Sequence, residues 1–136
     1  MKSSSIIGAT GLLCVVLSGV ALAQTGGAAQ KETATAHVHA LMAQGASSLK
    51  MSHTHLHHVI NCLVGPEGKG FDAAAADPCK GMGHGALPDS KGDKAEHARL
   101  WKALTVARKG LATTSLKASH AEAAKAAKLL AGSQGG

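Results

Sequence analysis

Apolar side chains recur at helical intervals through residues 33–64, and this pattern constrains the fold more than any other feature of the chain. At 100° per residue, one arc about 100° wide collects Val38, Leu41, Met42, Leu49, Leu56, Val59, Ile60 and Leu63. The phase is kept across the small residues at 45–48, whereas a turn there would usually lose it. We therefore expect one long helix, ended by Gly65 and Pro66, with a turn at 45–48 as the alternative.

Two further helical segments follow a long, irregular connection over 65–92, which is rich in glycine and proline. Asp93 followed by Glu96 is typical of a helix start. The segment that it begins should run to about Lys109, with a stripe of Leu100, Trp101, Leu104 and Ala107. The last helix should run from about Thr114 to Ala131, with a stripe of Leu116, Ala123, Ala127 and Leu130.

No strand signal exceeds a few residues, so the pattern predicts an all-α fold. We expect a small antiparallel helical bundle, with the long helix packed on a two-helix hairpin. The connection over 65–92 is predicted to hold one helical turn at 72–76 at most. This domain spans 33–131, preceded by a flexible leader over 24–32 and followed by a flexible tail over 132–136.

Residues 1–23 have the pattern of a secretory signal peptide. Lys2 supplies a positive charge, residues 6–17 are apolar, and Ala21-Leu22-Ala23 is a small-residue cleavage site. The apolar run is short for a membrane span. We therefore expect a periplasmic or secreted protein with no membrane span once the signal is removed.

The cysteines point to a disulfide. Cys14 lies in the signal segment, which leaves Cys62 and Cys79. In an oxidising compartment a bridge is the default, and closing a loop of this length stabilises a fold by about 3 kcal/mol in the chain-entropy model. The alternative is a thiolate ligand at Cys62. No C-x-x-C-H sequence is present, so covalent attachment of haem is not indicated.

The chain carries a formal net charge of +6, which bears on its partners. Its lysines are spread out without interleaved aromatic residues, so nucleic-acid binding is not expected. The charge is compatible with an acidic partner protein. The sequence leaves the oligomeric state open, with a homodimer as one alternative.

Histidine is the strongest indicator of function. The chain has nine histidines, but one Trp, one Phe and no Tyr. Imidazole is the commonest side-chain ligand for transition metals. His53 and His57 stand at i, i+4, a spacing that lets two imidazoles bind one ion.

A second set of soft ligands, Met51, His55, His58 and Cys62, follows the other flank of the predicted long helix. A Cys62–Cys79 bridge would carry Met82 and His84 from the loop toward His58. Imidazole and thioether groups together favour copper, zinc or nickel over magnesium or calcium. The predicted metal ligands are thus Met51, His53, His55, His57, His58, Met82 and His84.

Haem b is the alternative cofactor. His97 and His120 each lie in an apolar stripe of the last two helices. A turn near residues 110–111 would place them at similar depth in the core, where they could act as axial ligands. The other interpretation is two neutral core histidines, each hydrogen-bonded to a backbone carbonyl or a hydroxyl.

No enzyme signature is present: the chain has no Gly-x-Ser-x-Gly, Walker loop, His-Glu-x-x-His or paired carboxylates in a helical frame. We therefore expect a non-enzymatic protein. The first hypothesis is an exported protein that buffers, transfers or senses a transition metal. The others are a b-type haem protein and a pH-sensitive interaction module without a cofactor.

Overall fold

The computed structural model describes residues 27–132 and shows a bundle of helices. The predicted signal peptide at 1–23, the start of the leader and residues 133–136 of the tail lie outside the described residues. The elements are α1 (Gly27–Gln44), α2 (Leu49–Val64), the single turn α3 (Ala86–Asp89), α4 (Lys94–Leu111) and α5 (Leu116–Ala131). No strand occurs in this part of the chain, which confirms the all-α prediction.

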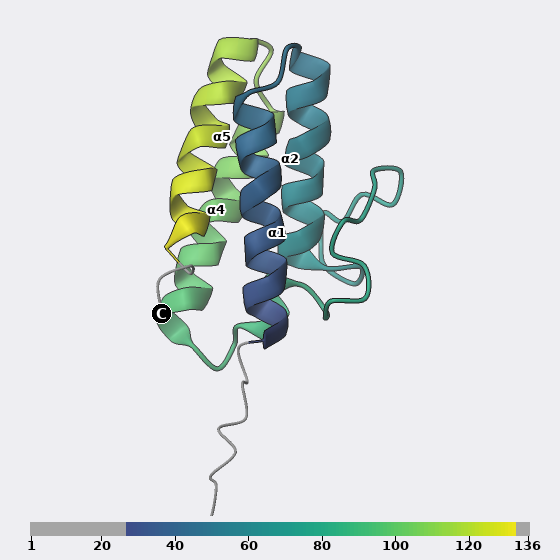
Figure 1. The fold of residues 1–136 in the computed structure, drawn as a ribbon, viewed down its shortest axis with the longest axis vertical. Coiled ribbons are helices and arrows are strands. Elements are labelled where there is room, and N and C mark those ends of the chain that lie inside the picture. Colours follow the sequence, from purple (N-terminus) through teal and green to yellow (C-terminus); the bar gives the residue numbers. More distant parts are fainter. Residues whose placement is uncertain (1–26, 133–136) are drawn as a thin grey trace, which may run out of the picture.

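The four long helices form an antiparallel bundle in which each helix packs on two neighbours (Figure 1). Helix α1 packs on α2 and α5, and α4 packs on α5 and α2. The turn at 45–48 and the turn at 112–115 lie at one end of the bundle, and the long connection lies at the other. None of the helices over 27–132 is long and apolar enough to cross a membrane.

The predicted single long helix over 33–64 is wrong, because the chain reverses at residues 45–48 and forms α1 and α2. Ser48 has an extended backbone, and its hydroxyl accepts a hydrogen bond from the Met51 amide at 3.2 Å, which caps the start of α2. Such a cap satisfies an amide that a helix start otherwise leaves without a partner. The architecture is therefore four helices rather than one helix on a hairpin.

The apolar stripe predicted for α1 is also wrong. Val38, Leu41 and Met42 are each nearly half exposed, at 47%, 48% and 47%. The buried face of α1 is instead built from small residues, including Ala29, Ala36, Ala40 and Ala43. Small side chains let the helix axes approach closely, so the smallest apolar residues of α1 pack inward rather than the largest ones.

Helix α1 also begins earlier than expected. Residues 27–32, which the sequence assigns to a flexible leader, form its first turns. Thr33 and Glu32 are fully buried there. The apolar periodicity gave no sign of this segment because its inward positions carry alanine, glutamate and threonine.

The hairpin of α4 and α5 agrees closely with the sequence. The Asp93 carboxylate accepts hydrogen bonds from the amides of Ala95 and Glu96, and so caps α4. Leu100, Leu104 and Ala107 are buried as expected. Two members of the predicted stripes differ: Trp101 is 48% exposed, and Leu116 is only partly buried beside the Ser115 cap of α5.

The connection between α2 and α4 is tied to the bundle by the Cys62–Cys79 disulfide, which confirms the predicted pairing. Asn61 holds the same segment, since its amide donates to the carbonyls of Asp72 and Ala76 and its carbonyl accepts from the Asp72 amide. The helical turn in this connection is α3, not the predicted turn at 72–76, where the chain forms a hydrogen-bonded turn.

Two glycines let the ends of this connection touch. Gly65 ends α2 with φ 71°, and a Cβ at this position would lie 1.7 Å from the His84 carbonyl oxygen. Gly85 has φ 112°, and a Cβ at this position would lie 2.5 Å from the Gly65 backbone nitrogen. Only glycine tolerates both the positive φ and the contact.

Candidate metal centre

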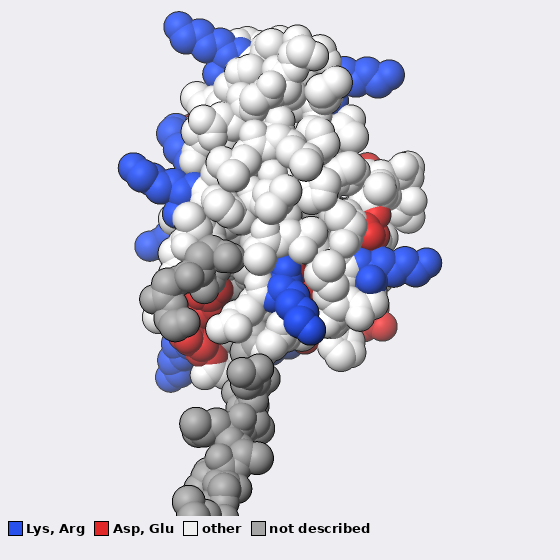
Figure 2. Space-filling view, in the orientation of Figure 1, with Lys and Arg blue, Asp and Glu red and all other residues white. Residues whose placement is uncertain are grey.

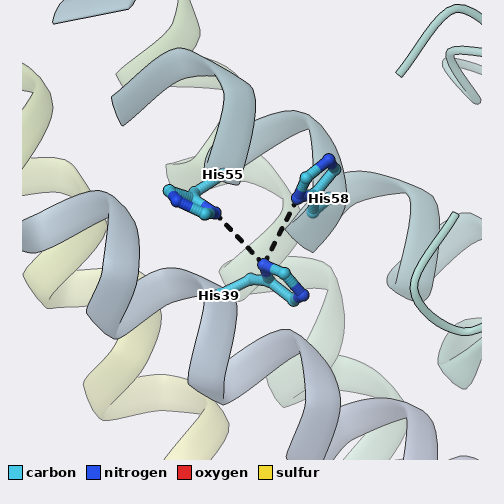
Figure 3. A group of neighbouring side chains, drawn as sticks. All are labelled: His39, His55 and His58. Atoms are coloured by element: carbon cyan, nitrogen blue, oxygen red, sulfur yellow. Dashed lines mark hydrogen bonds between the residues drawn. The ribbon is translucent and has the colours of Figure 1, made fainter. Parts of the chain in front are cut away.

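Three histidines from α1 and α2 point toward one another (Figure 3). His39 extends from α1, whereas His55 and His58 extend from one face of α2 at i, i+3. The His39 Nδ1 lies 3.2 Å from the His55 Nδ1 and 3.3 Å from the His58 Nδ1. One nitrogen from each ring lies within 4.8 Å of the others, and the three side chains are partly buried. This three-histidine cluster could hold a metal ion.

Hydrogen bonds between the three rings cannot account for both contacts of the His39 Nδ1. The Nδ1 of a neutral imidazole carries either one N–H or one lone pair. The His39 Nδ1 faces two other ring nitrogens, so it cannot donate to one and accept from the other in the same state. A cation between the three rings would accept a lone pair from each of them.

Two of the three nitrogen separations also fit tetrahedral coordination. Nitrogens about 2.0–2.1 Å from a zinc ion in a tetrahedral site lie about 3.3–3.4 Å from one another. The two measured separations from His39, 3.2 and 3.3 Å, are close to that value. Three protein ligands would leave the fourth position open.

The electrostatics keep two of the ligands in the neutral form that binds metals. Burial lowers the pKa of His39 to about 4, and the adjacent His58 and His55 contribute to the shift. Burial also lowers the pKa of His58, with contributions from His55 and His57. At neutral pH these two imidazoles therefore carry a free lone pair without first losing a proton.

Charged side chains are scarce on the two helices that form the cluster. Helices α1 and α2 contain only Lys31, Glu32 and Lys50 as charged residues apart from histidine. In Figure 2, the upper half of the face that carries α1 is uncharged at its centre, with lysine and arginine side chains at its margins. A donor set of nitrogens without carboxylates suits zinc, copper or nickel rather than magnesium or calcium.

The structure brings together His55 and His58 from the predicted ligand set, and it adds His39. His53 and His57 do not join the cluster: the buried His53 Nε2 has no hydrogen-bond partner in the described structure, and the His57 Nδ1 lies 3.2 Å from the Asp72 carboxylate. His39 was missed as a ligand because a single long helix places it on the opposite flank from His55 and His58. The cap at Ser48 was the sequence signal for the turn that brings them together.

The other predicted ligands also lie apart from the three histidines. Met51 is 47% exposed. The Met82 sulfur accepts a hydrogen bond from the Thr35 hydroxyl at 3.6 Å, and the His84 side chain is 86% exposed beside Asp89. Cys62 is buried in the disulfide, so it offers no thiolate.

His97 and His120 lie at opposite ends of the bundle, not at matching depth as the sequence suggested. The His97 Nδ1 lies 3.0 Å from the Leu87 carbonyl of α3, whereas the His120 Nε2 lies 2.9 Å from the Ala46 carbonyl in the turn between α1 and α2. The turn between α4 and α5 falls at 112–115 rather than 110–111, and this shift changes the pairing of the two helices. Each histidine thus bonds to a backbone carbonyl, and the geometric basis for a shared haem is lost.

Fold and site together define a helical bundle with one disulfide and a three-histidine cluster that could hold a metal ion. No family model, no curated protein and no solved structure matches the chain. The disulfide indicates an oxidising compartment outside the cytoplasm.

Proposed function

We propose that this protein is an exported, non-catalytic carrier or buffer of a transition metal ion, which His39, His55 and His58 bind through their Nδ1 atoms. The observation that carries the proposal is the convergence of three imidazole nitrogens from two helices, two of them 3.2 and 3.3 Å from the third. Zinc, copper and nickel are the ions that such a donor set would take.

An exchangeable ion fits this site better than a structural one. Structural zinc sites are closed by four protein ligands, whereas three histidines leave a position to which a partner's ligand could bind during transfer. The fold does not depend on the ion for its cohesion, since the bundle has an apolar core and a disulfide. The signal-peptide pattern at 1–23 and the disulfide support a periplasmic or secreted location.

Equilibrium dialysis of the mature chain without an affinity tag, followed by elemental analysis, tests the proposal. Zn²⁺, Cu²⁺ and Ni²⁺ should be tried separately. We expect about one tightly held equivalent per chain for at least one of these ions. The double variant H55A/H58A should lose that equivalent.

The matched control is H57A/H84A, which also removes two histidines but leaves the cluster intact. It should keep the tight equivalent. Equal loss in both double variants would mean that the histidines bind metal without a defined site, and no tight equivalent in the unchanged chain would overturn the proposal.

A further inference from the structure

A second concave site lies at the other end of the bundle from the turn at 45–48, where the long connection meets α4. It is a groove of about 260 Å³ between the end of α2, the turn α3 and the outer side of α4. Val64, Leu87 and Leu104 supply buried apolar surface to it. None of the three histidines of the candidate metal centre lines this groove, so it is independent of the proposed metal function.

Trp101 forms one wall and is held in place. Its indole N–H donates to the His97 Nε2 at 3.0 Å. Because Nε2 accepts this bond, the proton of neutral His97 is on Nδ1, from which it can be donated to the Leu87 carbonyl at 3.0 Å. The only tryptophan of the chain is thus a 48% exposed aromatic surface with a fixed orientation. Such a wall offers an apolar ligand a flat aromatic face to pack against.

The rim of the groove is positively charged. Lys69, Lys91 and Arg108 line it, and no aspartate or glutamate does. The Arg108 guanidinium donates one hydrogen bond to the Lys69 carbonyl at 2.7 Å, which fixes it beside the groove and leaves further N–H groups for a ligand. None of these three cations belongs to the ion pairs found among residues 27–132.

An apolar groove with an aromatic wall and a cationic rim is complementary to an organic anion. From this geometry we infer that the groove binds a small monocarboxylate with an apolar body, such as a medium-chain fatty acid. The carboxylate would lie against Arg108 and the lysines, and the apolar body would lie against Trp101 and the edge of Leu87. The volume of about 260 Å³ lies below the usual range of ligand pockets, which favours a small ligand.

Octanoate is the probe, and octanamide is its nearly isosteric uncharged control. The single Trp101 reports binding directly, through its fluorescence and through the only indole N–H signal of the chain in a ¹H–¹⁵N spectrum. We expect octanoate to shift both signals saturably and to bind at least tenfold more tightly than octanamide. Equal binding of the two probes, or no saturable effect of octanoate, would overturn the inference.

The variant K91Q/R108Q tests the rim. It should weaken octanoate binding at least tenfold and leave octanamide binding unchanged. The control K117Q/K128Q removes the same charge from exposed positions on α5, away from the groove, and should leave octanoate binding unchanged. If both variants weaken binding equally, the attraction belongs to the net charge of the protein rather than to this groove, and the inference fails.

Discussion

The Nδ1 of His39 on α1 lies 3.3 Å from the Nδ1 of His58, which is 19 residues later on α2. The His39 Nδ1 also lies 3.2 Å from the His55 Nδ1, and it cannot donate to one of these rings and accept from the other in the same state. The reversal of the chain at 45–48 therefore brings together three ligand nitrogens, which neither helix supplies by itself.

Replacing His39 with alanine should abolish tight metal binding, because His39 is the one ligand that α1 contributes and it contacts both others. We expect the affinity for the preferred ion to fall by more than about 100-fold. Loss of a residue that only supports a metal ligand through a hydrogen bond typically lowers the affinity by about 10- to 100-fold. Calorimetric titration measures this loss. The control is H37A, two residues away on the same helix but outside the cluster; comparable losses in both variants would contradict the assignment.

The stability of the metal-free protein should decrease as the pH falls from about 6.5 to about 4, in part because of His39. Its pKa is about 4 in the folded chain and 6.5 in the reference state, so the unfolded chain binds more protons over this range. Stability is therefore complete above the unfolded value and is lost as the pH falls. H39L should show a shallower decrease in urea titrations at several pH values, and an unchanged slope would argue against the shift.

Glu32 should have the opposite effect on the pH dependence of stability. Its side chain is fully buried on α1, with one oxygen accepting from the Gly85 amide and the other without a hydrogen-bond partner in the described structure. Burial raises its pKa from 4.5 to about 7, although the Gly85 hydrogen bond opposes the shift. The folded chain thus holds an extra proton between these values, and stability is lost as the pH rises from about 4.5 to 7.

The variant E32Q tests this directly, since glutamine keeps the acceptor for Gly85 and cannot ionise. At pH 8 it should be more stable than the unchanged chain by about 1–3 kcal/mol, with little difference at pH 4.5. The control E122Q should do the reverse at pH 8, because the Lys125 hydrogen bond lowers the pKa of Glu122 and the charged form is stabilised. If E32Q is less stable than the unchanged chain at pH 8, the fold stabilises the charged form of Glu32 and its pKa is not raised.

Removing the disulfide should weaken the fold without changing its helices. Cys62 and Cys79 are 17 residues apart, and the bridge should contribute about 3 kcal/mol. The double variant C62A/C79A should lose that amount in urea denaturation and keep its helical circular dichroism. Reducing agent should destabilise the unchanged chain and leave the variant unaffected, whereas a variant as stable as the bridged chain would show that Asn61 alone anchors the loop.

The sequence predicted the helix cap, the disulfide and the buried leucines of α4 and α5 correctly, because each has a direct chemical cause. Asp93 caps α4 because its carboxylate reaches two free amides, and Cys62 bonds Cys79. Leu100, Leu104 and Leu130 are buried, as their spacing indicated. These interactions depend on residues within one element or on a covalent bond, so the sequence alone identifies them.

The turn at 45–48 could not be chosen from periodicity, because the apolar phase continues through it. The deciding forces are the Ser48 cap and the packing of Ala36, Ala40 and Ala43 against neighbouring helices. A large apolar residue such as Leu41 carries more weight in a periodicity argument than alanine, although close packing favours alanine here. The error placed His39 on the wrong side of the molecule, so two of the three cluster histidines were found and the third was not.

The most direct test of the central claim is a zinc titration followed by the imidazole nitrogen signals of all nine histidines in ¹⁵N NMR spectra. If His39, His55 and His58 form the site, their Nδ1 signals should shift together and saturate at one equivalent of Zn²⁺, before any of the other six change. If other histidines respond first, or if these three signals stay in place at one equivalent, the cluster is not the metal site.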